Sequence, residues 1–101
     1  MNTYPFYDES NKLFSFEIDN FICSRKKTVQ IVSAIDGVQV VCHPKKFFSW
    51  FREEVFCEFE IDEQVFVIEE PFEDNSRFLI RPKNNKFCNK IYEVLSAFLK
   101  A

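Results

Sequence analysis

A chain of 101 residues and 12.1 kDa is long enough for one hydrophobic core and too short for two. Its single glycine excludes the glycine-rich phosphate loops of common nucleotide-binding enzymes, and no apolar run approaches the roughly 20 residues of a membrane-spanning helix. The net charge of −3 and the 14 phenylalanines predict a soluble, acidic domain with an aromatic core.

The start of the chain predicts a polar arm followed by strands. Residues 1–11 are polar and turn-rich apart from three aromatic side chains, so we expect an N-terminal arm ahead of a single domain at 12–101. Residues 13–19 alternate between apolar and polar side chains, which is typical of a half-buried strand. A short return strand is expected at 21–24. We expect the sheet edge near 13–18 to be available for pairing with a second copy of the chain.

The next segment admits two interpretations. An Asp-Gly pair at 36–37 separates two runs rich in β-branched residues, 28–35 and 38–42, and this is the strongest short-range signal for a β-hairpin. The alternative is a helix over 25–35 capped by Ser24, but three cations would then oppose the positive end of the helix dipole. We therefore expect the hairpin.

The second half of the chain predicts a short helix, a three-stranded meander and a longer helix. Apolar residues at helical spacing predict helices over 45–54 and from Lys86 onward. Strands, the first two joined by a tight turn at 62–63, are predicted at 55–61, 64–68 and 77–81. The predicted fold class is α+β: an antiparallel sheet of five to six strands with a short central helix and a longer C-terminal helix packed on one face.

The cysteines and the only histidine do not predict a reactive or metal-binding site. Cys23, Cys42, Cys57 and Cys88 lack zinc-ligand spacing, and we expect reduced, buried thiols in a cytoplasmic protein, with two disulfides in a secreted chain as the alternative. Cys42 and His43 are adjacent, so in an extended chain their side chains point to opposite faces and cannot form a nucleophile and base pair. We expect no catalytic residue, no cofactor and no metal.

Charge is segregated in the second half of the chain. Residues 53–74 contain ten acidic and no basic residues, whereas five cations follow at 77–90 without an acid among them. One interpretation is a solvated sheet face whose charges neutralise one another across the fold. The other is a surface that binds a basic protein. The candidate residues of that surface are Glu58, Glu60, Asp62, Glu63, Glu69, Glu70, Glu73 and Asp74.

A second candidate surface lies on the predicted helix at 45–54. Phe48 and Trp50 are two positions apart and cannot both face the core, so we expect one of them to be exposed and to contact a protein or a second copy. Exposed rings beside lysines also stack nucleic-acid bases, but the acidic total repels a polyanion, so we do not expect nucleic-acid binding.

These observations predict a non-enzymatic, cytoplasmic protein-binding domain that acts through the acidic meander or the aromatic helix surface. Two alternatives remain: a small acidic inhibitor, immunity-type protein or chaperone that masks a basic partner, and a structural domain that forms homo-oligomers. A homodimer is compatible with either surface, and no membrane partner is expected. Charge reversal at Glu58 and Glu60 would abolish binding by the acidic face and leave an aromatic interface intact.

Overall fold

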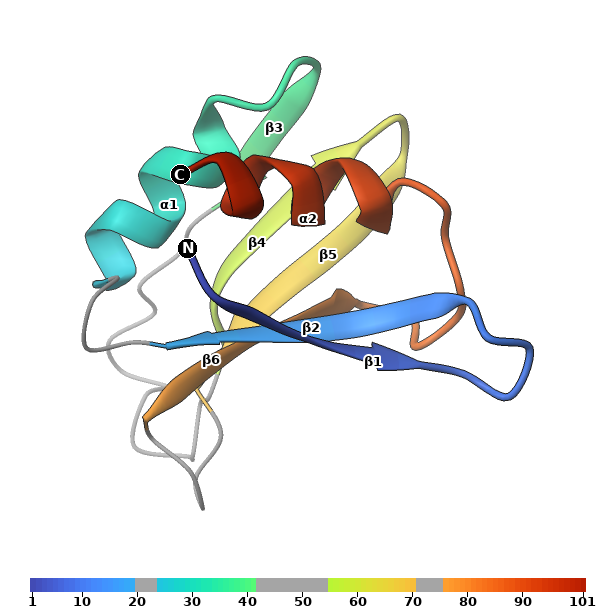
Figure 1. Ribbon diagram of the computed structural model, residues 1–101. Helices are drawn as coiled ribbons and strands as arrows, with labels where there is room; N and C mark the ends of the chain where they lie inside the picture. The colour runs from blue at the N-terminus through green and yellow to red at the C-terminus, as the bar shows by residue number, and fades with distance from the viewer. Residues whose placement is uncertain (20–23, 42–54, 71–75) are drawn as a thin grey trace.

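A computed structural model describes residues 1–19, 24–41, 55–70 and 76–101 (Figure 1). The strands of these ranges are β1 (Thr3–Tyr7), β2 (Leu13–Asp19), β3 (Val38–Val41), β4 (Val55–Ile61), β5 (Gln64–Glu69) and β6 (Arg77–Pro82). The helices are α1 (Arg25–Ser33) and α2 (Ile91–Lys100). All the strands join one antiparallel sheet in the order β1-β2-β6-β5-β4-β3, which confirms the predicted α+β class.

The two helices form a single layer on one face of the sheet (Figure 1). Helix α2 packs on β2 and β1, helix α1 packs on β3 and β4, and the two helices contact each other. Ile91, Val94 and Phe98 of α2 are fully buried against the sheet. The core of the described residues therefore lies between the sheet and this helix layer.

The meander of β4, β5 and β6 follows the prediction closely. Its first turn consists of Asp62 and Glu63, whose φ angles of 49° and 68° are both left-handed. Two consecutive left-handed residues make the turn whose twist matches that of the strands it joins. Ile61 and Gln64 are consequently paired directly across the turn.

The expected sheet edge at 13–18 is wrong, because β2 lies between β1 and β6. The missing neighbour is β1, which forms within the segment predicted as an N-terminal arm. Its sequence, TYPFY, contains Pro5 in the middle, opposite Phe16 of β2. Proline is tolerated in an outer strand where its missing N–H faces away from the ladder, but in a sequence it argues against a strand.

The expected hairpin at 28–42 is also wrong, because its first arm is helix α1. The Ser24 side chain accepts a hydrogen bond from the Lys27 N–H at 3.1 Å and caps the helix. Thr28 and Val32 are buried against the sheet, and this packing outweighs the unfavourable cations in the first turn. Gly37, at φ 77°, lies in the connection between α1 and β3 and not at the tip of a hairpin.

Helix α2 begins at Ile91, five residues later than the Lys86 predicted from the apolar stripe. Phe87 lies before the helix and is exposed, with its ring against that of Tyr92. Turns occupy the segment between β6 and α2, where the Asn84 side chain accepts a hydrogen bond from the Lys86 N–H.

Several predictions concern residues outside the described ranges. They are the strand at 21–23, the helix at 45–54 with Phe48 and Trp50, and the site candidates Glu73 and Asp74, together with Cys23, Cys42 and His43. Of the described cysteines, Cys57 and Cys88 are buried, as predicted. Neither of the helices in the described ranges has the length and apolar character needed to cross a membrane.

Candidate functional site

Much of the predicted acidic surface is neutralised by ion pairs within the fold. Register places alternate residues of β4, β5 and β6 on the face that points away from the helices. There Glu69 accepts a hydrogen bond from Arg81 at 2.6 Å, and Glu58 pairs with Lys83 at 3.1 Å. Glu70 pairs with Arg25 at the start of α1. These acids therefore fit the first interpretation, in which charges neutralise one another across the sheet.

The same face carries a second charged group that the sequence analysis did not identify. The Arg77 guanidinium lies 3.2 Å from the Glu17 carboxylate and 3.7 Å from that of Asp19, and it covers the Tyr4 ring at 3.6 Å. The Tyr4 hydroxyl donates to Asp19 at 3.0 Å. The hydrogen bond to Glu17 raises the pKa of Arg77 above its ordinary value. This group joins β1, β2 and β6 and is structural in character.

A different set of carboxylates gathers where three connections meet. The pairing of Val38 with Ile61 brings the α1–β3 connection beside the β4–β5 turn. Lys90, directly before α2, pairs with Asp62 of that turn at 2.9 Å and with Glu93 at 3.0 Å. We call this region the acidic end. It comprises Asp36, Asp62, Glu63 and Glu93 on or next to these connections, and Glu60, which precedes the turn on the sheet face away from the helices.

The acidic end keeps an excess of negative charge. Lys90 is the one cation that pairs with its carboxylates among the residues with described positions. Hydrogen bonds to Asp62 and then to Glu93 raise the pKa of Lys90 above its usual range. The Asp62 side chain is 68% exposed despite the pair. Five carboxylates and one ammonium make the acidic end more negatively charged than the whole chain, whose net charge is −3.

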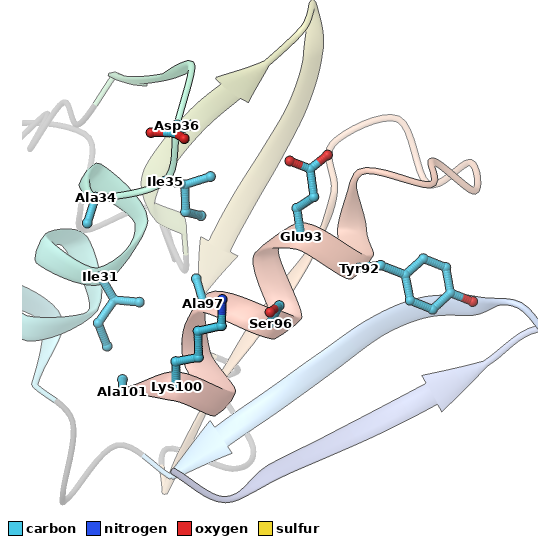
Figure 2. Close-up of a pocket in the computed structure, with 10 residues that line it drawn as sticks. All are labelled: Ile31, Ala34, Ile35, Asp36, Tyr92, Glu93, Ser96, Ala97, Lys100 and Ala101. Carbon is cyan, nitrogen blue, oxygen red and sulfur yellow. The ribbon is translucent and has the colours of Figure 1, made fainter.

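An open groove of about 710 Å³ lies between the two helices, and Asp36 and Glu93 of the acidic end are among the residues that line it (Figure 2). Its α1 side consists of Ile31, Ala34 and Ile35, and Asp36 follows directly. Its α2 side consists of Tyr92, Glu93, Ser96, Ala97 and Lys100. Asp36 and Glu93 lie toward one end of the groove, and Ala101 lies at the other (Figure 2). The groove thus has an apolar wall, a wall of polar and small residues, and two carboxylates at one end.

The sequence did not predict the groove or its two acids, Asp36 and Glu93, because one segment was assigned to the wrong element. Assigning 28–35 to a strand hid helix α1 and, at and after its C-terminal end, Ile31, Ala34 and Ile35, which line the groove opposite α2. Asp36 was therefore treated as a hairpin residue, and Glu93 of α2 had no neighbour assigned to it. The signal that favoured the helix was Ser24 before the cations, the cap that the structure contains.

The described residues do not assemble a metal site. Within those ranges no three side chains of His, Cys, Asp or Glu gather closely enough to hold an ion. The carboxylates of the acidic end face solvent or Lys90, which suits an electrostatic contact with another molecule.

The described chain is a two-layer α+β protein, an antiparallel six-stranded sheet with two helices on one face. No protein-family model, no curated protein and no solved structure matches it. Its function is therefore inferred from its own surfaces.

Proposed function

We propose that this chain is a non-enzymatic protein-binding domain that recognises a basic partner through its acidic end. The observation that carries the proposal is the distribution of charge after folding. Glu58, Glu69 and Glu70 of the predicted surface each pair with a cation of the described chain. Glu60 and Glu63 make no ion pair with any other residue of the described ranges. Folding brings the connection that contains Asp36, and Lys90 with its partner Glu93, to the β4–β5 turn.

The residue at the second position of the β4–β5 turn supports this proposal. A left-handed φ of 68° is adopted most easily by glycine, and a side chain there costs free energy on the order of 1 kcal/mol. The chain nevertheless has Glu63 at this position, exposed at the tip of the hairpin. A carboxylate at the tip adds to the field that attracts a cationic surface and raises its association rate.

The test begins with identifying a partner and then compares matched charge reversals. The chain is used to capture proteins from a lysate of its source cells, and each captured protein is purified and titrated against it by calorimetry and stopped-flow kinetics. Glu63→Lys changes the acidic end, and Glu9→Lys makes the same change of charge in the exposed β1–β2 turn.

We expect Glu63→Lys to lower the association rate constant several-fold at low salt, with a smaller effect at high salt, because steering by exposed charge is screened by ions. Glu9→Lys is expected to leave the rate within about twofold. Equal rates for the two variants, or a partner whose binding does not respond to salt, would remove the acidic end as the recognition surface.

A further inference from the structure

The residues of α2 that line the groove form a self-complementary stripe. They are Tyr92, Glu93, Ser96, Ala97 and Lys100, and their spacing places them on one side of the helix. The small residues Ser96 and Ala97 occupy its centre, where another helix can approach closely. Tyr92 is 47% exposed, held in place by the Leu13 N–H, which donates to its hydroxyl at 3.1 Å. Tyr92, Glu93 and Lys100 of the stripe are exposed, whereas Ser96 and Ala97 are partly buried.

The stripe has Glu93 toward one end and Lys100 at the other, and the Lys100 amine reaches back toward Ala97 (Figure 2). Glu93 and Lys100 are seven residues apart, which is close to two turns and about 10 Å along the helix axis. The midpoint between them falls between Ser96 and Ala97. When a second α2 lies antiparallel over this midpoint, Glu93 of each copy meets Lys100 of the other. The same contact then occurs twice, which is the condition for a two-fold symmetric interface.

Asp36 selects the antiparallel orientation. It lies toward the same end of the groove as Glu93 (Figure 2), so the incoming Lys100 of a second copy approaches Asp36 as well as Glu93, which already pairs with Lys90. In the parallel orientation, Asp36 and Glu93 of both copies would face one another and repel. The partly buried Ile31 and Ile35 on the α1 wall supply apolar area for the incoming helix to cover.

We propose that two copies of this chain pair through the groove, with α2 of each copy lying antiparallel between α1 and α2 of the other. The helix layers then meet face to face, and both sheets lie on the outside. This interface shares Asp36 and Glu93 with the acidic end, whereas Glu60, Asp62 and Glu63 lie on the β4–β5 hairpin and do not line the groove. Variants at Lys100 and Ala97 therefore test the pairing, and Glu63→Lys tests the proposed function separately.

Sedimentation equilibrium over a hundredfold range of protein concentration tests the pairing. The expected result for the unaltered chain is a reversible equilibrium between 12.1 kDa and twice that mass. Lys100→Glu places like charges at both ends of the stripe and is expected to raise the dimer dissociation constant about tenfold or more. The exchange Glu93→Lys/Lys100→Glu restores opposite charges across the interface and is expected to recover a large part of the loss.

A steric pair of variants tests the position of the interface without changing charge. Ala97→Trp fills the centre of the groove, whereas Gln30→Trp adds the same ring to an exposed residue of α1 that does not line it. We expect a monomer for Ala97→Trp and an unchanged dimer for Gln30→Trp. Circular dichroism of each variant verifies that it is folded before its mass is interpreted.

Three outcomes would overturn the proposal. The first is a monomer at every concentration. The second is a dimer that Lys100→Glu and Ala97→Trp leave unchanged, which would place the contact elsewhere on the molecule. The third is a charge exchange that binds no better than Lys100→Glu alone, because a reciprocal contact must respond to both residues together.

Discussion

At the scale of single residues, phenylalanine side chains pack α2 against the sheet and neighbouring strands against each other. The edge of the Phe98 ring meets the Phe16 ring with centroids 5.6 Å apart, and both side chains are fully buried. On the neighbouring strands, Phe59 and Phe66 stack at 5.4 Å. Such pairs contribute beyond the area they bury, because ring edges and faces carry opposite partial charges. Phe98 therefore supports α2 and, through it, one wall of the groove.

Phe98→Ala is expected to lower the free energy of unfolding by about 3–5 kcal/mol, because it leaves a cavity against Phe16. Leu99→Ala, at the adjacent and 53% exposed position, is expected to change it by no more than about 0.5 kcal/mol. Urea denaturation followed by circular dichroism measures both. Similar losses for the two variants would contradict the assignment of faces to α2.

At the scale of the element, α1 forms although the charges in its first turn are unfavourable for a helix. Arg25, Lys26 and Lys27 lie at the positive end of the helix dipole. Arg25 is compensated, since it pairs with Glu70 and covers the ring of Phe56 at 4.7 Å. The Ser24 cap satisfies the Lys27 N–H, and the remaining stability comes from packing on the sheet.

Ser24→Ala is expected to destabilise the protein by about 1 kcal/mol, because the Lys27 N–H loses its acceptor. Ser24→Asp keeps an acceptor and adds a negative charge beside three cations, so it is expected to retain or raise stability. Thermal and urea unfolding of both variants measure these changes in stability. A loss in Ser24→Asp as large as that in Ser24→Ala would mean that the cap is not what holds this end of the helix.

The success of sequence-based prediction differed between elements for physical reasons. The alternation of β4 was readable because Cys57, Phe59 and Ile61 share the buried face along one strand. The strand β1 was not readable, since its exposed position leaves it little alternation and Pro5 argues against a strand. In α1, β-branched residues favour a strand locally, and contact with the sheet reverses that preference.

The candidate site was predictable only in part. Glu60, Asp62 and Glu63 were identified because they are close in sequence and outward-facing in the alternation. Whether an acid is neutralised depends on partners that are distant in sequence, such as Lys83 for Glu58, and those follow from register. Asp36 and Glu93 join the site only through the packing of α1 against α2, which no local pattern encodes.

At the scale of the whole molecule, the sheet order ties the two ends of the chain together. Strand β2, near the start, pairs with β6, which belongs to the meander of the second half. Helix α2, at the end, packs on β2 and β1. The N-terminal strands therefore cannot separate from the sheet without exposing the core residues Phe16 and Ile18.

We expect the described elements to unfold as one cooperative unit. Amide hydrogen exchange is the measurement, and the slowest amides of β2 and of β5 are expected to share one free energy of opening. If β2 exchanged at a clearly lower free energy than β5, the N-terminal strands would form a separate unit, and the single domain predicted for residues 12–101 would not hold.

The proline in β1 has a consequence for how copies of this protein meet. A five-residue outer strand with three aromatic side chains would ordinarily invite the strand of another molecule to extend the sheet. Pro5 has no N–H to donate at the centre of that strand, so an added strand would find an unmatched carbonyl there. Addition of a strand from another molecule at this edge, as in fibril growth, is therefore disfavoured. Reversible contact through side chains is the easier route to self-association.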